Sequence, residues 1–237
     1  MIASAGTVDT GAIDPLAEIA ALCREYGAWL HVDGAYGGLF ALCDEGRARL
    51  SGIEQADSVA LDPHKALFLP YGTGAVLVRD RAHLLGSFSA VADYIQPLGE
   101  SEVGPSPADL SPELTRHFRA LRLWLPLQLA GVAAFRAAQE EKLALARYFH
   151  ARLATLHGFD PGPPPQLSVV AFRHKSGDAF NERLLRAVQQ DGRVMLSGTR
   201  IEGAFTLRCA ILCFRTHIEH VDEALAALAD GAAALGN

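Results

Sequence analysis

The sequence has little of what marks secreted, membrane-spanning or nucleic-acid-binding proteins. It has only four cysteines in 237 residues, Cys23, Cys43, Cys209 and Cys213, and no Cys-x-x-Cys pair, so we expect reduced thiols, mostly in the core. Residues 1–11 contain no basic stretch followed by a long apolar run, which excludes a secretory signal or a membrane span there. The formal net charge of −6 gives no electrostatic attraction to nucleic acid or anionic lipid. We therefore expect a cytoplasmic protein that binds a small molecule and has neither a nucleic-acid nor a membrane partner.

Sequence motifs of two common enzyme classes are also missing. The turn Gly72-Thr73-Gly74 lacks the remainder of any phosphate-binding loop, and no Gly-x-Ser-x-Gly elbow occurs. These absences argue against a P-loop NTPase and against a serine hydrolase.

The sequence does contain the pattern of an ordinary globular protein, with 50% hydrophobic residues and enough length for a sizeable core. Asp14 and Pro15 predict a helix that begins with an Asp cap and ends near Tyr26, and Gly27 follows where a left-handed C-cap is expected. The apolar residues of this helix repeat at helical spacing and should pack on a sheet. They are Leu16, Ile19, Ala20 and Cys23.

Strand and helix patterns divide the chain into two predicted units. Short apolar strands at 29–32, 58–61 and 75–78 alternate with helix, which is typical of a mostly parallel α/β sheet. From His117 the pattern is helical, with a kink or an end expected at Pro126. The remaining elements predict a small α+β unit: strands at 167–172, 194–196 and 205–211, a helix at 179–190 and a last helix from about 217. We place the domain boundary between residues 125 and 126, giving domains 1–125 and 126–237.

Polar side chains follow two of the predicted strands, at the edge where an open parallel sheet binds its ligands. Asp33 follows the first strand, and Asp62-Pro63-His64-Lys65 follows the second. A pyridoxal cofactor needs an acid and a lysine so placed, because the carboxylate keeps the pyridine nitrogen protonated and the amine forms a Schiff base. Each residue alone could be a turn, cap or solvated residue. Their joint occurrence in this order favours the cofactor site.

A metal site is the alternative within the same segments. Imidazole and carboxylate ligands suit zinc or iron, and the segments offer His31, Asp33, Asp62 and His64. That interpretation leaves Lys65 without a role, so we expect no metal.

Three arginines, Arg116, Arg119 and Arg122, recur at a spacing that places them on part of one helix face. A solvated face and an arginine that reaches substrate or a partner subunit are equally compatible with this spacing.

Two long segments resemble the cofactor region of a known family. ASAGTVDTGAIDPLAEIAALCREYGAWLHVDGAYGG (3–38) and ADSVALDPHKALFLPYGTGAVLVRD (56–80) carry the motifs HVDxAYGG and DPHK. They are similar to the group II pyridoxal-phosphate-dependent amino-acid decarboxylases, which include the aromatic-amino-acid, histidine and glutamate decarboxylases. The similarity continues through HFRALRLWLPLQLAG to the last helix. It implies a type I PLP-dependent transferase-like fold, with part of the large domain followed by the small α+β domain, and a homodimer at full length.

The resemblance also implies roles in binding pyridoxal 5'-phosphate. Asp33 would form a salt bridge with the pyridinium nitrogen, and Ala35 would pack its methyl group against the ring. Lys65 would hold the cofactor as a Schiff base, and His64 would lie near its phosphate and the substrate.

Two further residues, Thr7 and Asp62, would face the cofactor. Asp62 stands where many relatives have an asparagine that helps to bind phosphate, and a carboxylate there would repel that anion unless a water or a proton mediates. Thr7 lies in a strand-end turn, and Val8 stands where relatives often have a second threonine.

Two departures from the family pattern are expected to matter. Relatives are much longer, and their amino-terminal portion supplies most phosphate ligands and an aromatic ring, usually histidine, that stacks on the cofactor. We therefore expect a truncated form or a fragment. In aromatic-amino-acid decarboxylases the loop equivalent to 96–112 carries a tyrosine that helps to protonate the product. Here no aromatic residue occurs between Gln96 and His117, and Pro107 falls close to that position.

The sequence thus predicts a PLP-dependent carboxy-lyase that acts on an amino acid whose side chain is not determined. Other type I PLP reactions stay open, namely oxidative deamination, aldol cleavage and a sulfur-lyase reaction. From a different class, a non-catalytic remnant that keeps only the dimerisation surface also stays open.

Overall fold

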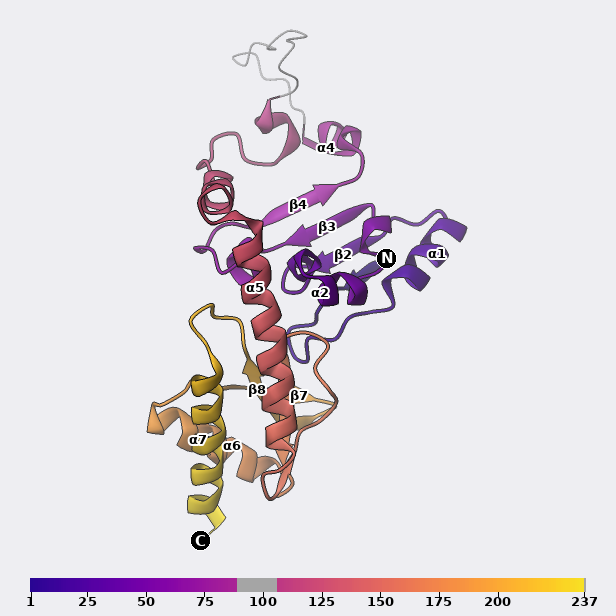
Figure 1. Ribbon diagram of the computed structural model, residues 1–237. Coiled ribbons are helices and arrows are strands. Elements are labelled where there is room, and N and C mark those ends of the chain that lie inside the picture. Colours follow the sequence, from indigo (N-terminus) through magenta and orange to yellow (C-terminus); the bar gives the residue numbers. More distant parts are fainter. Residues whose placement is uncertain (89–105, 237) are drawn as a thin grey trace.

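The computed structural model describes residues 1–88 and 106–236, which form two four-stranded sheets with separate cores. In Figure 1 the first sheet belongs to the amino-terminal half and the second to the carboxyl-terminal half. The long helix α5 (Leu121–Leu153) passes along both. Within the described ranges, no helix is long and apolar enough to cross a membrane. The predicted α/β fold, with a small α+β unit after it, is confirmed.

The first sheet has the order β1-β2-β3-β4. Strands β1 (Ile2–Ser4), β2 (His31–Gly34) and β3 (Ser58–Leu61) are parallel, and β4 (Ala75–Val78) joins β3 in antiparallel orientation. The mostly parallel sheet is therefore confirmed, and β3 and β4 have the predicted bounds. β2 begins later than predicted because the N–H of Leu30 donates to the Asp57 carboxylate at 2.7 Å. β1 was not predicted.

Helix α1 (Leu16–Glu25) covers one face of the first sheet and ends as expected. Gly27 has a φ of 61° and provides the left-handed C-cap. The predicted cap at Asp14 is wrong, because the Asp14 carboxylate instead accepts the backbone N–H of Ser4 at 2.7 Å, and the helix has no side-chain cap. The predicted apolar face is buried or packed against the core: Leu16, Ile19, Ala20 and Cys23.

The opposite face of the first sheet is only partly covered, since Ser58 on it is buried and Asp33 on it is exposed. The register places Asp33, Ala60 and Val76 side by side on it. Val76 is 56% exposed, and Ile2, on the same face of β1, is 72% exposed. This part of the fold therefore presents apolar surface to solvent.

Helix α5 is interrupted at Gly131 and not, as predicted, at Pro126. Gly131 has φ 73° and ψ 158°, a backbone conformation that only glycine adopts without strain. Pro126 lies near the start of the helix, where its missing N–H removes a single hydrogen bond.

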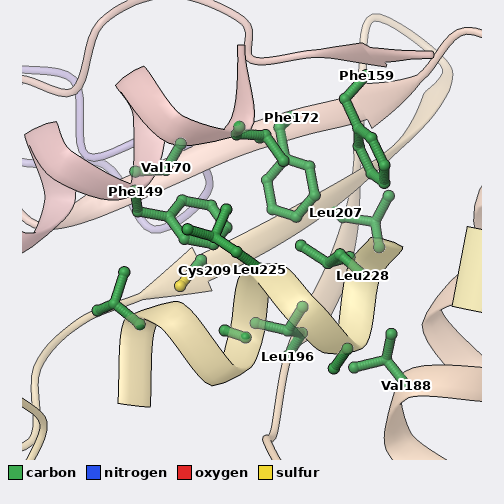
Figure 2. Packing of buried hydrophobic residues seen from close by; sticks show 14 of the residues in the cluster. Phe149, Phe159, Val170, Phe172, Val188, Leu196, Leu207, Cys209, Leu225 and Leu228 are labelled. Atoms are coloured by element: carbon green, nitrogen blue, oxygen red, sulfur yellow. The ribbon is translucent and has the colours of Figure 1, made fainter. Parts of the chain in front are cut away.

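The second sheet is antiparallel and has the order β5-β6-β8-β7. Its strands are β5 (Phe159–Asp160), β6 (Val169–His174), β7 (Ser197–Ile201) and β8 (Ala204–Ala210), and α6 (Asp178–Asp191) and α7 (Ile218–Gly236) complete the unit. Figure 2 shows its core, in which Phe149 of α5 and Phe172 of β6 meet edge to face with ring centroids 5.4 Å apart. The strands predicted at 167–172 and 205–211 and the two helices are present with shifted ends. The strand predicted at 194–196 is wrong, because those residues are not in a strand and β7 begins only at Ser197, and β5 was not predicted.

The two cores draw on different stretches of sequence. The core of the second sheet contains only residues from Leu145 to Leu228. The core of the first sheet combines residues 3–66 with Leu143, Leu167 and Val169. The boundary that we predicted between residues 125 and 126 falls inside α5, and this division into domains stays a prediction.

The remaining helices are short, and the loop predicted at 96–112 is only partly described. Helices α2 (Asp44–Arg49), α3 (Pro63–Ala66) and α4 (Arg81–Phe88) belong to the first half. The loop lies outside the described residues up to 105, and its described end contains a 3-10 helix, Pro107–Leu110, capped by Ser106.

All four cysteines are free, and Cys213 alone among them is exposed, so the predicted reduced thiols are confirmed.

Candidate functional site

The two candidate strand ends lie next to each other at one edge of the first sheet. β2 and β3 pair in parallel, and the N–H of Asp62 donates to the carbonyl of Ala35 at 3.2 Å. Both strands therefore present their carboxyl ends at the same edge, as the sequence predicted. Helix α3 begins directly after β3 and carries His64 and Lys65 on this edge.

The ammonium group of Lys65 is oriented by one carboxylate. Pro63 starts α3 at a position where no N–H is needed, and Asp62 just before it makes no cap. Instead its Oδ2 lies 2.8 Å from Lys65 Nζ and 3.7 Å from His64 Nε2. The Lys65 side chain is 37% exposed, so a ligand at the sheet edge can reach the amine.

His64 has a buried nitrogen without a partner. Its Nδ1 makes no hydrogen bond within the described residues, although a buried polar atom left unpaired costs free energy. The ring lies against Tyr71, with centroids 5.3 Å apart. A polar ligand beside Lys65 would supply the missing partner, so this nitrogen fits a bound cofactor or substrate.

Asp33 offers an exposed carboxylate next to the same edge. Its Oδ1 accepts the N–H of Ala35 at 3.0 Å, which fixes the turn that follows β2. A carboxylate so held and open to solvent can meet a protonated ring nitrogen, as predicted for a pyridoxal cofactor. Ala35 itself is partly exposed beside it.

Thr7 lies in the turn after β1, where the N–H of Ala5 donates to the Asp33 carbonyl at 2.8 Å. Its hydroxyl is 2.9 Å from Thr10 Oγ1 and accepts the N–H of Ala12 at 3.1 Å. The structure therefore shows Thr7 stabilising its own turn, and its contact with a cofactor stays a prediction.

The carboxyl-terminal unit holds this turn in place. The carboxylate of Asp9 accepts the Thr199 hydroxyl at 2.6 Å, and the Asp9 carbonyl accepts Nε of Arg208 at 3.1 Å. Two strands of the second sheet thus fix a turn at the candidate site.

Lys65 is one of three lysines in the chain, and the other two are placed differently. Lys142 is fully buried in α5 and donates to Glu141 Oε2 at 2.7 Å and to the Phe214 carbonyl at 3.3 Å. Lys175 is exposed, directly after β6 of the second sheet. Only Lys65 stands at the carboxyl edge of the parallel strands.

The residues considered for a metal site are not arranged as ligands. His31 Nδ1 is 2.8 Å from the hydroxyl of Ser58, and Asp62 is paired with Lys65. Throughout 1–88 and 106–236, no group of three or more His, Cys, Asp or Glu side chains could hold a metal ion.

Two glycines in the segment HVDGAYGG make close backbone contacts, and the contact at Gly37 leaves no room for a Cβ. A Cβ on Gly37 would lie 2.1 Å from the Ala5 carbonyl oxygen, and a Cβ on Gly34 would lie 3.0 Å from the Ala60 carbonyl oxygen. The backbone therefore turns tightly after β2 and approaches neighbouring backbone closely at Gly37.

Tyr36, between these glycines, links the site to the second half of the chain. Its hydroxyl is 2.9 Å from Ser168 Oγ and accepts the Ser168 N–H at 2.8 Å. Burial raises the pKa of Tyr36 to about 12 from 10.0. The unfolded chain therefore releases this proton at a lower pH than the folded chain, so stability falls as pH rises from about 10 to about 12.

Replacing Tyr36 by phenylalanine should lower the free energy of unfolding by about 1–3 kcal/mol, because the buried N–H of Ser168 loses its acceptor. Urea unfolding followed by circular dichroism measures this. Tyr26→Phe is the control, since Tyr26 is 76% exposed and its change should stay within about 0.5 kcal/mol. Equal stability of both variants would show that the link between the halves contributes nothing.

A hollow of about 740 Å³ lies beside α3, lined in part by Pro63, Thr73, Gly74 and Pro107. Pro107, which stands near the position of the family's loop tyrosine, thus shares a hollow with the neighbour of His64.

Each of the three arginines singled out from the sequence makes a bond within the chain. Arg119 pairs with Glu113, Arg116 donates to the Pro107 carbonyl, and Arg122 donates to the Tyr71 carbonyl.

Sequence reasoning missed two side chains at the site. One is Tyr71, whose ring lies against His64, and its position in the segment after Lys65 is a usable signal. Gln139 of α5 donates to the carbonyl of Ala66, next to Lys65, at 3.0 Å. No local pattern reveals that contact.

Residues 1–175 match the sequence profile of the pyridoxal-dependent decarboxylase conserved domain. The chain is 38% identical over 234 residues to the aromatic-L-amino-acid decarboxylase of Bacillus atrophaeus, which covers 93% of this chain and 48% of that protein. It is 30% identical over 236 residues to a phenylacetaldehyde synthase of Petunia hybrida, with coverage of 93% and 47%.

Solved structures show the same similarity in three dimensions. The crystal structure of Oryza sativa TDC with PLP and tryptamine matches with a TM-score of 0.93 at 26% identity, over 100% of this chain and 51% of that chain. The chain spans about half the length of the curated relatives it matches.

Proposed function

The chain belongs to the pyridoxal-dependent decarboxylase family, and from that premise we propose that the protein it forms part of decarboxylates an aromatic amino acid with pyridoxal 5'-phosphate. The observation that carries the proposal is the position of Lys65. It stands at the carboxyl edge of the parallel strands, beside β2, whose next-to-last residue is the exposed Asp33. The aromatic substrate class is supported by the relative from Bacillus atrophaeus.

The bound cofactor supplies the electron sink for breaking the bond to the substrate carboxylate. Lys65 would hold the cofactor through its side-chain amine. Asp33 would keep the ring nitrogen protonated through its exposed carboxylate. His64 would bind the phosphate or the substrate through its unpaired Nδ1, and Ala35 would pack on the ring.

Asp62 has a different role in this proposal from the phosphate contact implied by the family pattern. Its carboxylate is 2.8 Å from Lys65 Nζ, which supports a role in orienting the lysine. A direct contact between two anions would need a proton or a water between them, and the phosphate contact stays a prediction.

Formation of an aldehyde from the same substrate is the second candidate reaction. It is favoured by the lack of any aromatic residue between Gln96 and His117 and by the similarity to a phenylacetaldehyde synthase. In this reading the site residues keep their roles, and the carbon that loses its carboxyl group would be oxidised by dioxygen. Dioxygen would be reduced to hydrogen peroxide, and water would replace the amine, which leaves as ammonia.

The proposal is tested with the completed domain, by which we mean this chain together with an amino-terminal half of the family domain. The completed domain is loaded with pyridoxal 5'-phosphate and given aromatic and acidic amino acids in turn. We expect carbon dioxide and an aryl-substituted amine from the aromatic set. A cofactor-loaded protein that releases carbon dioxide from none of them would favour the non-catalytic remnant.

By itself the 237-residue chain should bind pyridoxal 5'-phosphate weakly, with a Kd of about 1 mM or more. The family's other phosphate ligands belong to the half that this chain does not align with, and Asp33 and Asp62 repel the phosphate. The partly covered sheet face, with Ile2 and Val76, should also promote aggregation. Absorbance titration and size-exclusion chromatography measure both effects. Tight, stoichiometric binding would show that the chain contains a complete phosphate site.

We also propose that the completed domain is a homodimer in the cytoplasm. Large apolar side chains are exposed around the start of α5, where Phe118 is 74% and Trp124 58% exposed. Patches of this kind support a protein interface. The location in the cytoplasm stays a prediction.

A further inference from the structure

We propose that Gln139 is a positioning residue for Lys65, because its side-chain amide fixes the backbone on which Lys65 stands. The inference rests on the proposed function only in taking Lys65 as the lysine that binds the cofactor. Gln139 lies on α5, well away from α3 in sequence, and its side chain is fully buried.

One amide group joins three elements. Gln139 Nε2 donates to the carbonyl of Ala66 and to the carbonyl of Leu39, each at 3.0 Å. Ala66 is the last residue of α3 and follows Lys65, whereas Leu39 belongs to the 3-10 helix Gly38–Leu42 that follows β2. The side chain therefore ties the helix of Lys65 to α5 and to the segment after Asp33.

The carbonyl of Ala66 cannot find a donor in its own helix. In a longer helix its partner would be the N–H of the residue four positions later, but that residue is Pro70, which has no N–H. The N–H of Leu69 donates elsewhere, to the Pro63 carbonyl at 3.3 Å. The side-chain amide of Gln139 therefore supplies the donor for the Ala66 carbonyl that the neighbouring backbone lacks.

The backbone after Lys65 also needs support from outside. Phe68 has a φ of 58°, in the left-handed region that a non-glycine residue keeps only when surrounding contacts enforce it. Leu67 and Leu69 on either side are 2% and 9% exposed and anchor the turn by packing. The amide of Gln139 is the polar contact that completes this anchor.

Burying Gln139 has a cost that its two hydrogen bonds must offset. Its Oε1 has no partner among the described residues, and an unpaired buried oxygen is unfavourable. An apolar side chain of similar size would avoid that cost but would leave the carbonyl of Ala66 without a donor and remove the bond from α5 to the carbonyl of Leu39. The favourable contribution of the buried amide therefore comes from its hydrogen bonds to the carbonyls of Ala66 and Leu39.

The inference is tested on the 237-residue chain by the rate at which a small neutral acylating reagent labels Lys65, divided by the rate for Lys175. Lys65 is paired with Asp62 and Lys175 is exposed, so the parent ratio should lie well below the ratio in urea. Gln139→Met, which keeps the size and loses the donor, should move the ratio about fivefold toward the urea value, the factor expected for one buried hydrogen bond.

Gln128→Met is the matched control, because Gln128 is exposed on the same helix and its loss should leave the ratio unchanged. Circular dichroism confirms that each variant is folded. A folded Gln139→Met variant with the parent ratio would overturn the inference.

If Gln139→Met does not fold, hydrogen exchange of the parent decides. The amide hydrogens of Leu67 and Leu69 should be protected as strongly as those of α5 around Gln139, because the proposal makes them one unit. Exchange as fast as in an unsupported surface turn would refute it. Neither measurement uses cofactor or activity, so a cofactor found on another lysine would refute the proposed function and leave these results standing.

Discussion

Replacing Lys65 by arginine should abolish the covalent bond between protein and cofactor and lower kcat of the completed domain by about 10²–10⁴-fold or more. Arginine keeps the positive charge that faces Asp62 at the sheet edge, so the fold and the ion pair should survive. Its guanidinium stays protonated and cannot act as the amine that the cofactor requires. The loss is therefore one of chemistry and not of structure.

Peptide mapping after borohydride reduction measures the bond directly. In the parent, the mass of the cofactor should appear on the peptide that contains Lys65 and be absent from that peptide in Lys65→Arg. Lys175→Arg is the matched control, because this exposed lysine lies in the second unit, and it should keep both the label on Lys65 and full activity. Cofactor mass on Lys142 or Lys175 in the parent would refute the assignment.

The second large effect is expected at Pro107, where a tyrosine should shift the products toward amine. After carbon dioxide leaves, the substrate carbon needs a proton, and general-acid assistance to such a step is worth about 10²–10⁴ in rate. The parent has no aromatic residue between Gln96 and His117. It should therefore form amine slowly or divert part of its turnover to aldehyde or to pyridoxamine phosphate.

The structure makes Pro107→Tyr a mild change. Pro107 begins a 3-10 helix capped by Ser106, and its carbonyl, which accepts from Arg116, is retained in the variant. Amine, aldehyde and pyridoxamine phosphate are quantified for the parent, Pro107→Tyr and Pro107→Phe. The phenylalanine variant controls for ring size, so a gain only with tyrosine identifies the hydroxyl. Fast, clean amine formation by the parent, unchanged by tyrosine, would place the proton donor elsewhere.

The elements of the fold were predictable where local sequence decides them. β3 and β4 have the predicted bounds because short apolar runs between turn residues leave little choice. The interruption of α5 was assigned to Pro126 and occurs at Gly131. Proline near the start of a helix removes only one hydrogen bond, so the helix continues through Pro126. The φ of 73° at Gly131 changes the direction of the chain between its two halves, and local sequence does not predict such a change.

The candidate site was predictable for a topological reason. Parallel strands present their carboxyl ends at one edge, so Asp33 and Lys65 could be expected there together. The role of Gln139 could not be predicted in this way, because its contact with Ala66 joins residues on separate helices. The sequence also did not predict the pairing of Asp62 with Lys65. The family resemblance indicated a contact between Asp62 and the cofactor phosphate, whereas in the structure the Asp62 carboxylate pairs with the Lys65 ammonium group.

The unequal make-up of the two cores sets an order for folding on the ribosome. The core beneath the first sheet includes Leu143, Leu167 and Val169, so strands β1, β2 and β3 emerge from the ribosome before the side chains that complete their packing. The second core draws only on Leu145 to Leu228 and can close soon after its last helix is synthesised. During synthesis the apolar surface of the first sheet therefore stays exposed for a time. Chaperones bind chains in this state, and such chains are prone to aggregate.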